Sequence, residues 1–154
     1  MRDRTDAASI RQATGDDVER IEAIALAAYS KYVARIGRKP APMLADFRKS
    51  VALDRVVVIE AAGLLAGYRV GWPERQSYFI EDIAVDPSHQ ARGFGRLLMQ
   101  DAIDCARRLK LATLRLYTNA AMTENLAIYT HMGFVETHRA VEDGYDRIFM
   151  QLSL

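Results

Sequence analysis

The chain has 154 residues, half of them hydrophobic, and its formal net charge at pH 7 is +1. This length suits one domain with a sizeable core, and the hydrophobic content excludes a disordered chain. The balanced charge argues against a nucleic acid partner, and no apolar run is long enough to span a membrane. We therefore expect a single domain over residues 1–154, in which residues 1–8 are polar and loosely ordered.

Two further features bear on location. The first residues, Met-Arg-Asp-Arg-Thr-Asp, lack the apolar core of a signal peptide. Cys105 is the only cysteine, so no disulfide can form within the chain. Both features favour a cytoplasmic location.

The first third of the chain predicts one strand and two helices. Residues 9–13 are predicted to form the strand, and Thr14 then caps a helix, with Asp17 as its capping-box partner. This helix ends near residues 29–34. A connector rich in glycine and proline follows, and residues 43–49 predict a short second helix.

The rest of the chain predicts mostly strands, with two helices between them. Strands are expected at residues 55–60, 64–72, 76–85, 112–118, 134–140 and 145–152. A long amphipathic helix begins at Phe94, with its apolar positions at Leu98, Ala102, Cys105 and Leu109. Thr123 caps a further helix, and Gly133 ends it. This order predicts a mixed α/β (α+β) fold with about seven strands and about four helices.

The stretch from Ile83 to Met99 joins a strand, a glycine-containing turn and the start of a helix. The first turn of a helix has unpaired N–H groups and a partial positive charge, so this arrangement predicts an anion site. No Lys-Ser or Lys-Thr follows the glycines, which excludes a Walker loop. Leu98 stands where a dinucleotide-binding motif needs its third glycine.

The residues present are Gln90-x-x-Gly93-x-Gly95, after a strand that ends Val85-Asp86-Pro87. They resemble the acetyl-CoA signature of the GCN5-related N-acetyltransferase (GNAT) superfamily, Gln/Arg-x-x-Gly-x-Gly/Ala. A second stretch, with Asn125, Tyr129 and Gly133-Phe134, is similar to another acetyl-CoA motif of that superfamily. The resemblance covers nearly the whole chain and implies a sheet that splays between its fourth and fifth strands.

The resemblance implies acetyl-CoA as co-substrate, bound by main-chain amides around the glycines and by Asn125. The residues expected to bind it are Ile83, Val85, Gln90, Ala91, Arg92, Gly93, Phe94, Gly95, Arg96, Asn119, Asn125 and Tyr129. By the same resemblance, Tyr129 points toward the thioester sulfur and acts as general acid, and the N–H of Val85 meets the oxyanion. The alternative for Tyr129 is a core aromatic residue on an amphipathic helix.

Acetyl transfer also needs a base, because alkyl ammonium groups are protonated at neutral pH. Glu81 is the leading candidate, since it alternates with Ile83 and Val85 on one strand face. Its alternative is a simple ion pair with a surface arginine, and Tyr117 and Glu60 are weaker candidate bases. The Glu81-Asp82 tract resembles that of spermidine/spermine acetyltransferases, but regular alternation sends Asp82 to the opposite face unless a bulge intervenes.

The acceptor is expected to be a primary amine on a small molecule, such as a polyamine or an amino acid. In the superfamily, the segment between the first two helices commonly forms one wall of the acceptor site. Candidate acceptor contacts are Tyr29, Tyr32, Arg35, Arg38, Met43, Asp82 and Tyr117. The acidic pair favours a cationic acceptor and the basic residues an anionic one, so the charges conflict.

Other functions stay open from the sequence. They are a non-catalytic acyl-CoA sensor, an acetyltransferase for protein or peptide amines, and an enzyme for longer acyl donors. His89, His131 and His138 show no metal-ligand spacing, so no metal is expected. Homodimers are common in the superfamily, so a homodimer is also expected.

Overall fold

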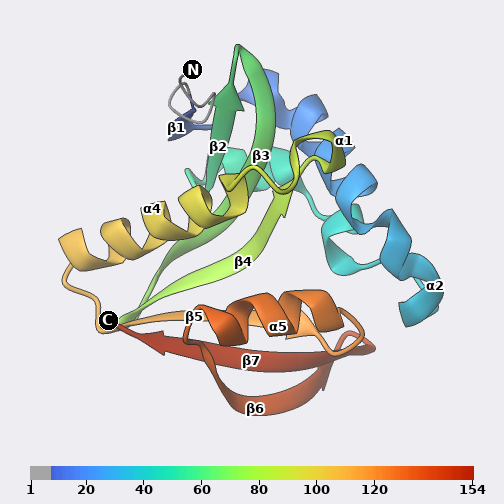
Figure 1. Cartoon of the computed structure of the whole chain (residues 1–154), viewed down its shortest axis with the longest axis vertical. Helices are drawn as coiled ribbons and strands as arrows, with labels where there is room; N and C mark the ends of the chain where they lie inside the picture. Colours follow the sequence, from blue (N-terminus) through green and yellow to red (C-terminus); the bar gives the residue numbers. More distant parts are fainter. Residues whose placement is uncertain (1–7) are drawn as a thin grey trace. The chain divides into compact units, whose positions relative to one another are not determined.

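A computed structural model describes residues 8–154 (Figure 1). Residues 1–7, which carry most of the expected loose segment, lie outside the described residues. Within residues 8–154 the strands form a seven-stranded sheet in the order β1-β2-β3-β4-β5-β7-β6. The sheet order and the parallel pairing of β4 with β5 confirm the predicted mixed fold.

The strands are β1 (Ser9–Gln12), β2 (Val56–Ala61), β3 (Leu64–Glu74), β4 (Ser77–Val85), β5 (Thr113–Asn119), β6 (Val135–Glu142) and β7 (Tyr145–Ser153). The α-helices are α1 (Val18–Tyr29), α2 (Val33–Ile36), α3 (Phe47–Ala52), α4 (Phe94–Arg108) and α5 (Thr123–His131). Single 3-10 turns lie at η2 (Gly15–Asp17), η3 (Ser30–Tyr32), η4 (Ala41–Leu44) and η5 (Pro87–His89). The chain forms two compact units: the first runs to Gly71 and resumes over Asp82–Asp101, and the second comprises Trp72–Glu81 and Ala102–Leu154.

In the first unit, β1, β2 and β3 pair antiparallel around a small apolar core. Fully buried Ile59, Ala66 and Leu98 form this core with Phe94, the first residue of α4. Burying such side chains contributes about 1.5 to 3 kcal/mol each, so this core holds the start of α4 firmly on the strands.

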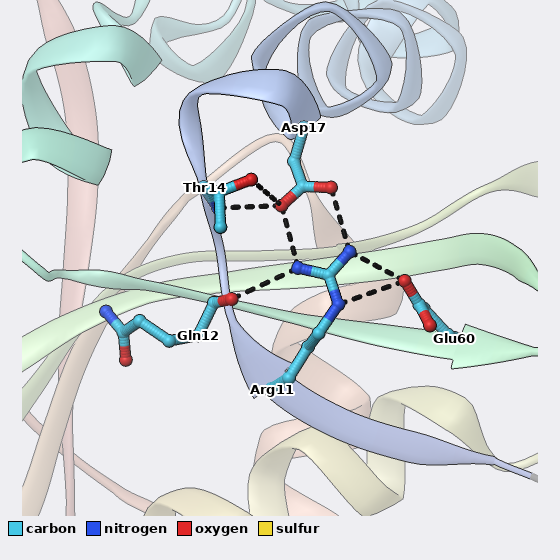
Figure 2. A network of polar contacts seen from close by, with 5 residues as sticks. All are labelled: Arg11, Gln12, Thr14, Asp17 and Glu60. Atoms are coloured by element: carbon cyan, nitrogen blue, oxygen red, sulfur yellow. Dashed lines mark hydrogen bonds and ion pairs between the residues drawn. The ribbon is translucent and has the colours of Figure 1, made fainter.

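A polar network fixes the start of the first helical segment (Figure 2). The Arg11 guanidinium donates to both carboxylate oxygens of Asp17, at 2.8 and 2.9 Å, and to Glu60 of β2 at 2.6 Å. The N–H of Thr14 donates to Asp17 at 2.7 Å, which confirms the predicted capping pair. The network therefore ties β1, β2 and the turn before α1 together.

The pairing of β2 with β3 contains a register shift between Ile59 and Glu60. Ile59 pairs with Gly67 and Glu60 with Leu65, so Ala66 is the extra residue of a β-bulge. At Gly67 an added Cβ would lie only 2.7 Å from the carbonyl oxygen of Ala84, so the position requires glycine. The bulge also lets the Ala66 carbonyl accept the N–H of Asp86 at 2.8 Å, where β4 leads into the next loop.

In the second unit, β4 and β5 pair in parallel over Ser77–Ile80 and Thr113–Leu116. β7 pairs antiparallel with both β5 and β6 (Figure 1). Burial alternates along β4, β5 and β7, so one face of these three strands is buried and the other is half-exposed. The buried face carries Tyr78, Ile80, Leu114, Leu116, Ile148 and Met150.

Three local predictions were wrong. The short helix α3 begins after Asp46, whose carboxylate accepts the N–H of Lys49 at 3.1 Å, because a capping oxygen outweighs the prolines that had suggested an earlier start. Thr123 is the first residue of α5, and Met122 occupies the cap position. Leu109 is 51% exposed, since it lies beyond the end of α4 at Arg108.

Candidate functional site

The loop over residues 86–95 links the end of β4 to the start of α4 in the first unit. Ala91 and Gly93 both adopt left-handed backbone conformations, with φ of 64° and 83°. The first helical bond of α4 runs from the N–H of Leu97 to the carbonyl of Gly93 at 3.0 Å. Amides ahead of it have no acceptor within the helix, so this exposed turn offers donors and a partial positive charge to an anion.

The side chains of this loop divide into exposed and anchoring ones. Gln90, Arg92 and Arg96 are exposed, and the amide of Gln90 also donates to the carbonyl of Val85 at 3.2 Å. Phe94 is 3% exposed and its ring belongs to the core. A contact from Phe94 to a bound anion can therefore come only from its main chain.

Asp86 anchors the loop, a role that the sequence analysis missed. Its carboxylate accepts the Ser88 hydroxyl, contacts the Nδ1 atom of His89 at 3.3 Å and pairs with Arg20 of α1 at 3.6 Å. The Ser88 hydrogen bond, with help from His89 and Arg20, lowers the pKa of Asp86. Asp86 is therefore ionised near neutral pH and holds the loop against α1.

Two further candidate residues lie on α5 in the second unit. Asn125 and Tyr129 are one turn apart on α5, and both are half-buried. The Tyr129 ring packs edge-on against Phe134 with centroids 5.8 Å apart, and the N–H of Phe134 donates to the Tyr129 carbonyl at 3.0 Å. Gly133 makes this turn possible with φ of 104°. The half-buried Tyr129 ring is thus held between the turn at Gly133 and the ring of Phe134.

Asn119 closes the turn that leads into α5. Its Oδ1 atom accepts the N–H of Ala121 at 2.9 Å, and its carbonyl accepts the N–H of Met122, also at 2.9 Å. These bonds give Asn119 a structural role in the turn, in addition to the predicted role in binding acetyl-CoA. Val85 and Ile83 are partly buried and pack against the core of the first unit.

Glu81 and Asp82 point to opposite faces of β4, as alternation predicts. Glu81 is half-buried, whereas Asp82 is 7% exposed. The Asp82 carboxylate accepts hydrogen bonds from the hydroxyls of Tyr29, at 2.6 Å, and Tyr68. These two phenols supply donors for a carboxylate that would otherwise be costly to bury.

The other predicted acceptor contacts differ in exposure. Tyr32 is 3% exposed, with Lys31 and Arg35 placing their cationic groups 5.0 and 5.2 Å from its ring centre. Arg35 and Arg38 are exposed, and Met43 is half-buried. Tyr117 is half-buried in the second unit, under the guanidinium of Arg147 at 4.3 Å. Burial of both Tyr29 and Tyr32 favours packing as their main task.

Within residues 8–154, no three His, Cys, Asp or Glu side chains are grouped in a way that would hold a metal ion. None of the helices in the same range has the length and apolar content needed to cross a bilayer.

The motif-bearing part of the chain matches a known family. Residues 52–136, more than half of the chain, match the family model described as an acetyltransferase (GNAT) domain. The chain therefore belongs to the GNAT acetyltransferase family, as its two motifs indicated. The match includes β2 to α5 and leaves α1, α2 and α3 outside, apart from the last residue of α3.

Two curated relatives match over shorter stretches than the family model. Streptothricin acetyltransferase of Streptomyces lavendulae is 37% identical over 82 residues, which is 51% of this chain and 42% of that protein. The [ribosomal protein bS18]-alanine N-acetyltransferase of Escherichia coli K12 is 40% identical over 55 residues, which is 36% of this chain and 37% of that protein. The chain thus spans less than half of the length of either relative.

A solved structure supports the fold over a much larger part of the chain. The PaiA N-acetyltransferase from Thermoplasma acidophilum, in complex with coenzyme A, superposes with a TM-score of 0.79 at 15% identity. The superposition covers 96% of this chain and 99% of that one. At this identity the likeness shows the shared fold alone.

Proposed function

We propose that this protein is an acetyl-CoA-dependent N-acetyltransferase that transfers the acetyl group directly to a primary amine. The observation that carries the proposal is the loop over residues 86–95. Its two left-handed residues and the exposed start of a 15-residue helix form a main-chain anion site of the kind that holds a pyrophosphate. The family match extends over this loop and over α5.

The general acid in this proposal is Tyr129. The departing thiolate needs a proton or a hydrogen bond, and a phenol held on a helix face can supply one. The contacts with Phe134 and the bend at Gly133 support this role, because they fix the ring without burying it. Asn125, one turn earlier, would bind the pantetheine arm.

The base is Glu81, acting through a water molecule, and the N–H of Val85 would stabilise the oxyanion. Glu81 is half-buried on β4, which supports this role. Its neighbour Asp82 instead accepts hydrogen bonds from two buried tyrosines. The amine must lose its proton before it attacks the acetyl carbonyl. Cys105 is half-buried on α4, which suits a packing residue and favours direct transfer over an acetyl-cysteine intermediate.

The acceptor in the proposal is a small-molecule amine. The relatives' names include both an antibiotic acetyltransferase and an acetyltransferase for a ribosomal protein, so an amine on a protein or peptide is the alternative. The helices expected to border the acceptor lie almost wholly outside the family match. The match therefore does not distinguish a small-molecule amine from an amine on a protein or peptide. The expected homodimer and cytoplasmic location stay predictions.

The test is thiol release from acetyl-CoA with a panel of amines, amino acids and peptides. We expect clear turnover with at least one acceptor, and a loss of about 10²-fold or more in kcat for Tyr129→Phe with unchanged CoA binding. Tyr145→Phe is the matched control, since it removes a tyrosine hydroxyl from β7, a different element of the same unit. CoA binding without turnover on any acceptor would point to the sensor instead, and equal kcat for Tyr129→Phe would remove Tyr129 from the mechanism.

A further inference from the structure

A row of rings crosses five strands of the second unit on one sheet face. Trp72 of β3 contacts Phe79 of β4 at a centroid distance of 5.2 Å, and Phe79 contacts Tyr117 of β5 at 5.8 Å. Tyr117 contacts Phe149 of β7 at 5.7 Å, and Phe149 stacks on His138 of β6 at 4.3 Å and 8°. We call these five residues the ring row.

The ring row lies on the half-exposed face of these strands. Phe79, Tyr117 and Phe149 alternate with buried residues of the opposite face, and Tyr117 pairs directly with Phe149 in the register. His138 is exposed and pairs directly with Phe149. A continuous aromatic surface that is neither buried nor scattered marks a binding surface for an apolar or flat partner.

Glu81 shares this face. It stands two residues after Phe79 on β4, so both side chains project from the same side of the strand. The β4–β5 register pairs Ile80 with Leu116, and the next position on each strand is Glu81 and Tyr117. The proposed base and the middle residue of the ring row therefore each follow directly after the last residue of their strand that this register pairs.

The charges of this face disfavour a polycationic acceptor. Arg115 pairs with Phe79 in the register, and it forms no ion pair with any residue from 8 to 154. Arg147 lies over the Tyr117 ring at 4.3 Å while it pairs with Glu142 at 3.1 Å. Glu142 balances the charge of Arg147, so within the described part of the chain the uncompensated guanidinium of this face is that of Arg115. The carboxylate of Glu81 beside this guanidinium suits an acceptor with a single amine better than spermidine, whose further charges would meet Arg115.

We infer that the acceptor is a primary amine attached to an aromatic body, whose ring packs on Phe79 and Trp72 while its amine lies toward Glu81. The inference rests on the proposed acetyltransferase activity and narrows its substrate class. Arg147 already covers one side of Tyr117, so we place the ligand ring at Phe79, beside Trp72. Aromatic pairs gain attraction beyond that of buried area, which is what separates an aromatic ligand from a saturated one.

A matched pair of amines isolates this preference. 2-Phenylethylamine and 2-cyclohexylethylamine have the same charge and length and differ only in the aromaticity of the ring. We expect kcat/KM to be roughly three- to tenfold higher for the phenyl compound, and spermidine to be the poorest of the three. Equal or reversed preference for the cyclohexyl compound, or a preference for spermidine, would overturn the inference while leaving acetyl transfer intact.

A binding measurement separates this inference from the proposed function. Trp72 is the only tryptophan of the chain, so intrinsic tryptophan fluorescence reports on one end of the ring row. In the presence of CoA, 2-phenylethylamine should change this fluorescence at lower concentration than 2-cyclohexylethylamine does. If the fluorescence discriminates the two amines but no thiol is released, acetyl transfer is refuted and the aromatic acceptor site is not. If the fluorescence does not discriminate them, the aromatic acceptor is refuted.

Substitution of Phe79 tests whether its ring causes the preference for the phenyl compound. Phe79→Leu should lower the phenyl-to-cyclohexyl ratio of kcat/KM to near one, because it keeps the apolar volume and removes the ring. Val141→Ala is the control, since Val141 is 72% exposed and pairs with Asp146, off the register line of the ring row. The inference fails if Phe79→Leu, folded with an unchanged melting temperature, keeps the wild-type ratio.

Discussion

The carboxylate of Asp82 accepts a hydrogen bond of 2.6 Å from the hydroxyl of Tyr29, which joins β4 to the last residue of α1. A second phenol, that of Tyr68 on β3, donates to the other carboxylate oxygen. The three side chains link a helix and two strands within the first unit. Because Asp82 is held on the inner face of β4, its neighbour Glu81 is directed to the other face.

Asp82→Asn should therefore destabilise the protein. Hydrogen bonds to a charged group contribute about 1.5 to 3 kcal/mol, so we expect a loss in the free energy of unfolding of that order. Tyr29→Phe should cost less, and the double variant should cost less than the sum because both changes remove the same bond. Urea titrations of the four proteins measure this coupling. A normally stable Asp82→Asn variant with a raised KM for the acceptor would instead support the contact with substrate predicted from the sequence.

Gly93→Ala and Ala91→Gly should have opposite effects on coenzyme binding. Both residues have positive φ, and a left-handed non-glycine residue costs about 1 to 2 kcal/mol. No atom lies within 4 Å of a Cβ built at Gly93, so the penalty there comes from the backbone alone. We expect Gly93→Ala to weaken CoA binding about tenfold and Ala91→Gly to keep or improve it. Calorimetric titration of CoA measures both, and a harmless Gly93→Ala would show that the loop need not hold this conformation.

The Arg11 network predicts a loss of stability in acid. The Arg11 guanidinium, which donates to both oxygens of Asp17, lowers the pKa of Asp17 from 3.8 to about 2. A lowered carboxylate pKa stabilises the fold above the ordinary pKa, and that contribution disappears as the pH falls from about 4 to about 2. We expect Asp17→Asn to cost about 1 to 2 kcal/mol at pH 7, after allowance for solvent screening.

The difference between wild type and Asp17→Asn should therefore shrink when melting is followed at pH 3 and below. Glu19→Gln serves as control, because Glu19 is an exposed carboxylate in the next turn. A difference that stays constant from pH 7 to pH 2 would show that Asp17 acts by packing and not by charge.

Gly67→Ala should be among the most damaging single substitutions in the first unit. An added Cβ would meet the backbone oxygen of Ala84 at 2.7 Å, and backbone cannot rotate away as a side chain can. We expect a loss of about 2 to 3 kcal/mol, measured by thermal melting. The matched control is Gly15→Ala, where no atom lies within 4 Å of the added carbon. Equal melting temperatures for the two variants would contradict the close approach of β3 to Ala84.

Much of this architecture follows from local sequence signals. Alternation along β4 predicted that Glu81 and Asp82 face opposite ways, and Gln90-x-x-Gly93-x-Gly95 located the loop between β4 and α4. Each signal resides in a few adjacent residues. Errors arose where two local signals competed, as at Asp46, where a capping side chain sets the start of α3 later than the prolines suggested.

The contacts that sequence reasoning missed are those between distant residues. Asp82 meets Tyr29 over a separation of 53 residues, and Arg69 donates to the carbonyl of Leu98 and to Asp101 on α4. The ring row depends on the register of five strands, which neither composition nor spacing reveals. A tyrosine or arginine in the sequence does not show which distant partner will satisfy it once it is buried.

The Arg11 network has two halves with different sequence separations. Asp17 lies six residues from Arg11, whereas Glu60 lies 49 residues away. The contact with Asp17 can form within a short segment of chain. The contact with Glu60 requires β2 to lie beside β1, and closing a loop of 49 residues is slower. Substitution of Asp17 should therefore retard refolding more than substitution of Glu60, whose loss should chiefly accelerate unfolding. One guanidinium thus acts at two moments in the assembly of the protein, first at the turn before α1 and later at the closing of β1 on β2.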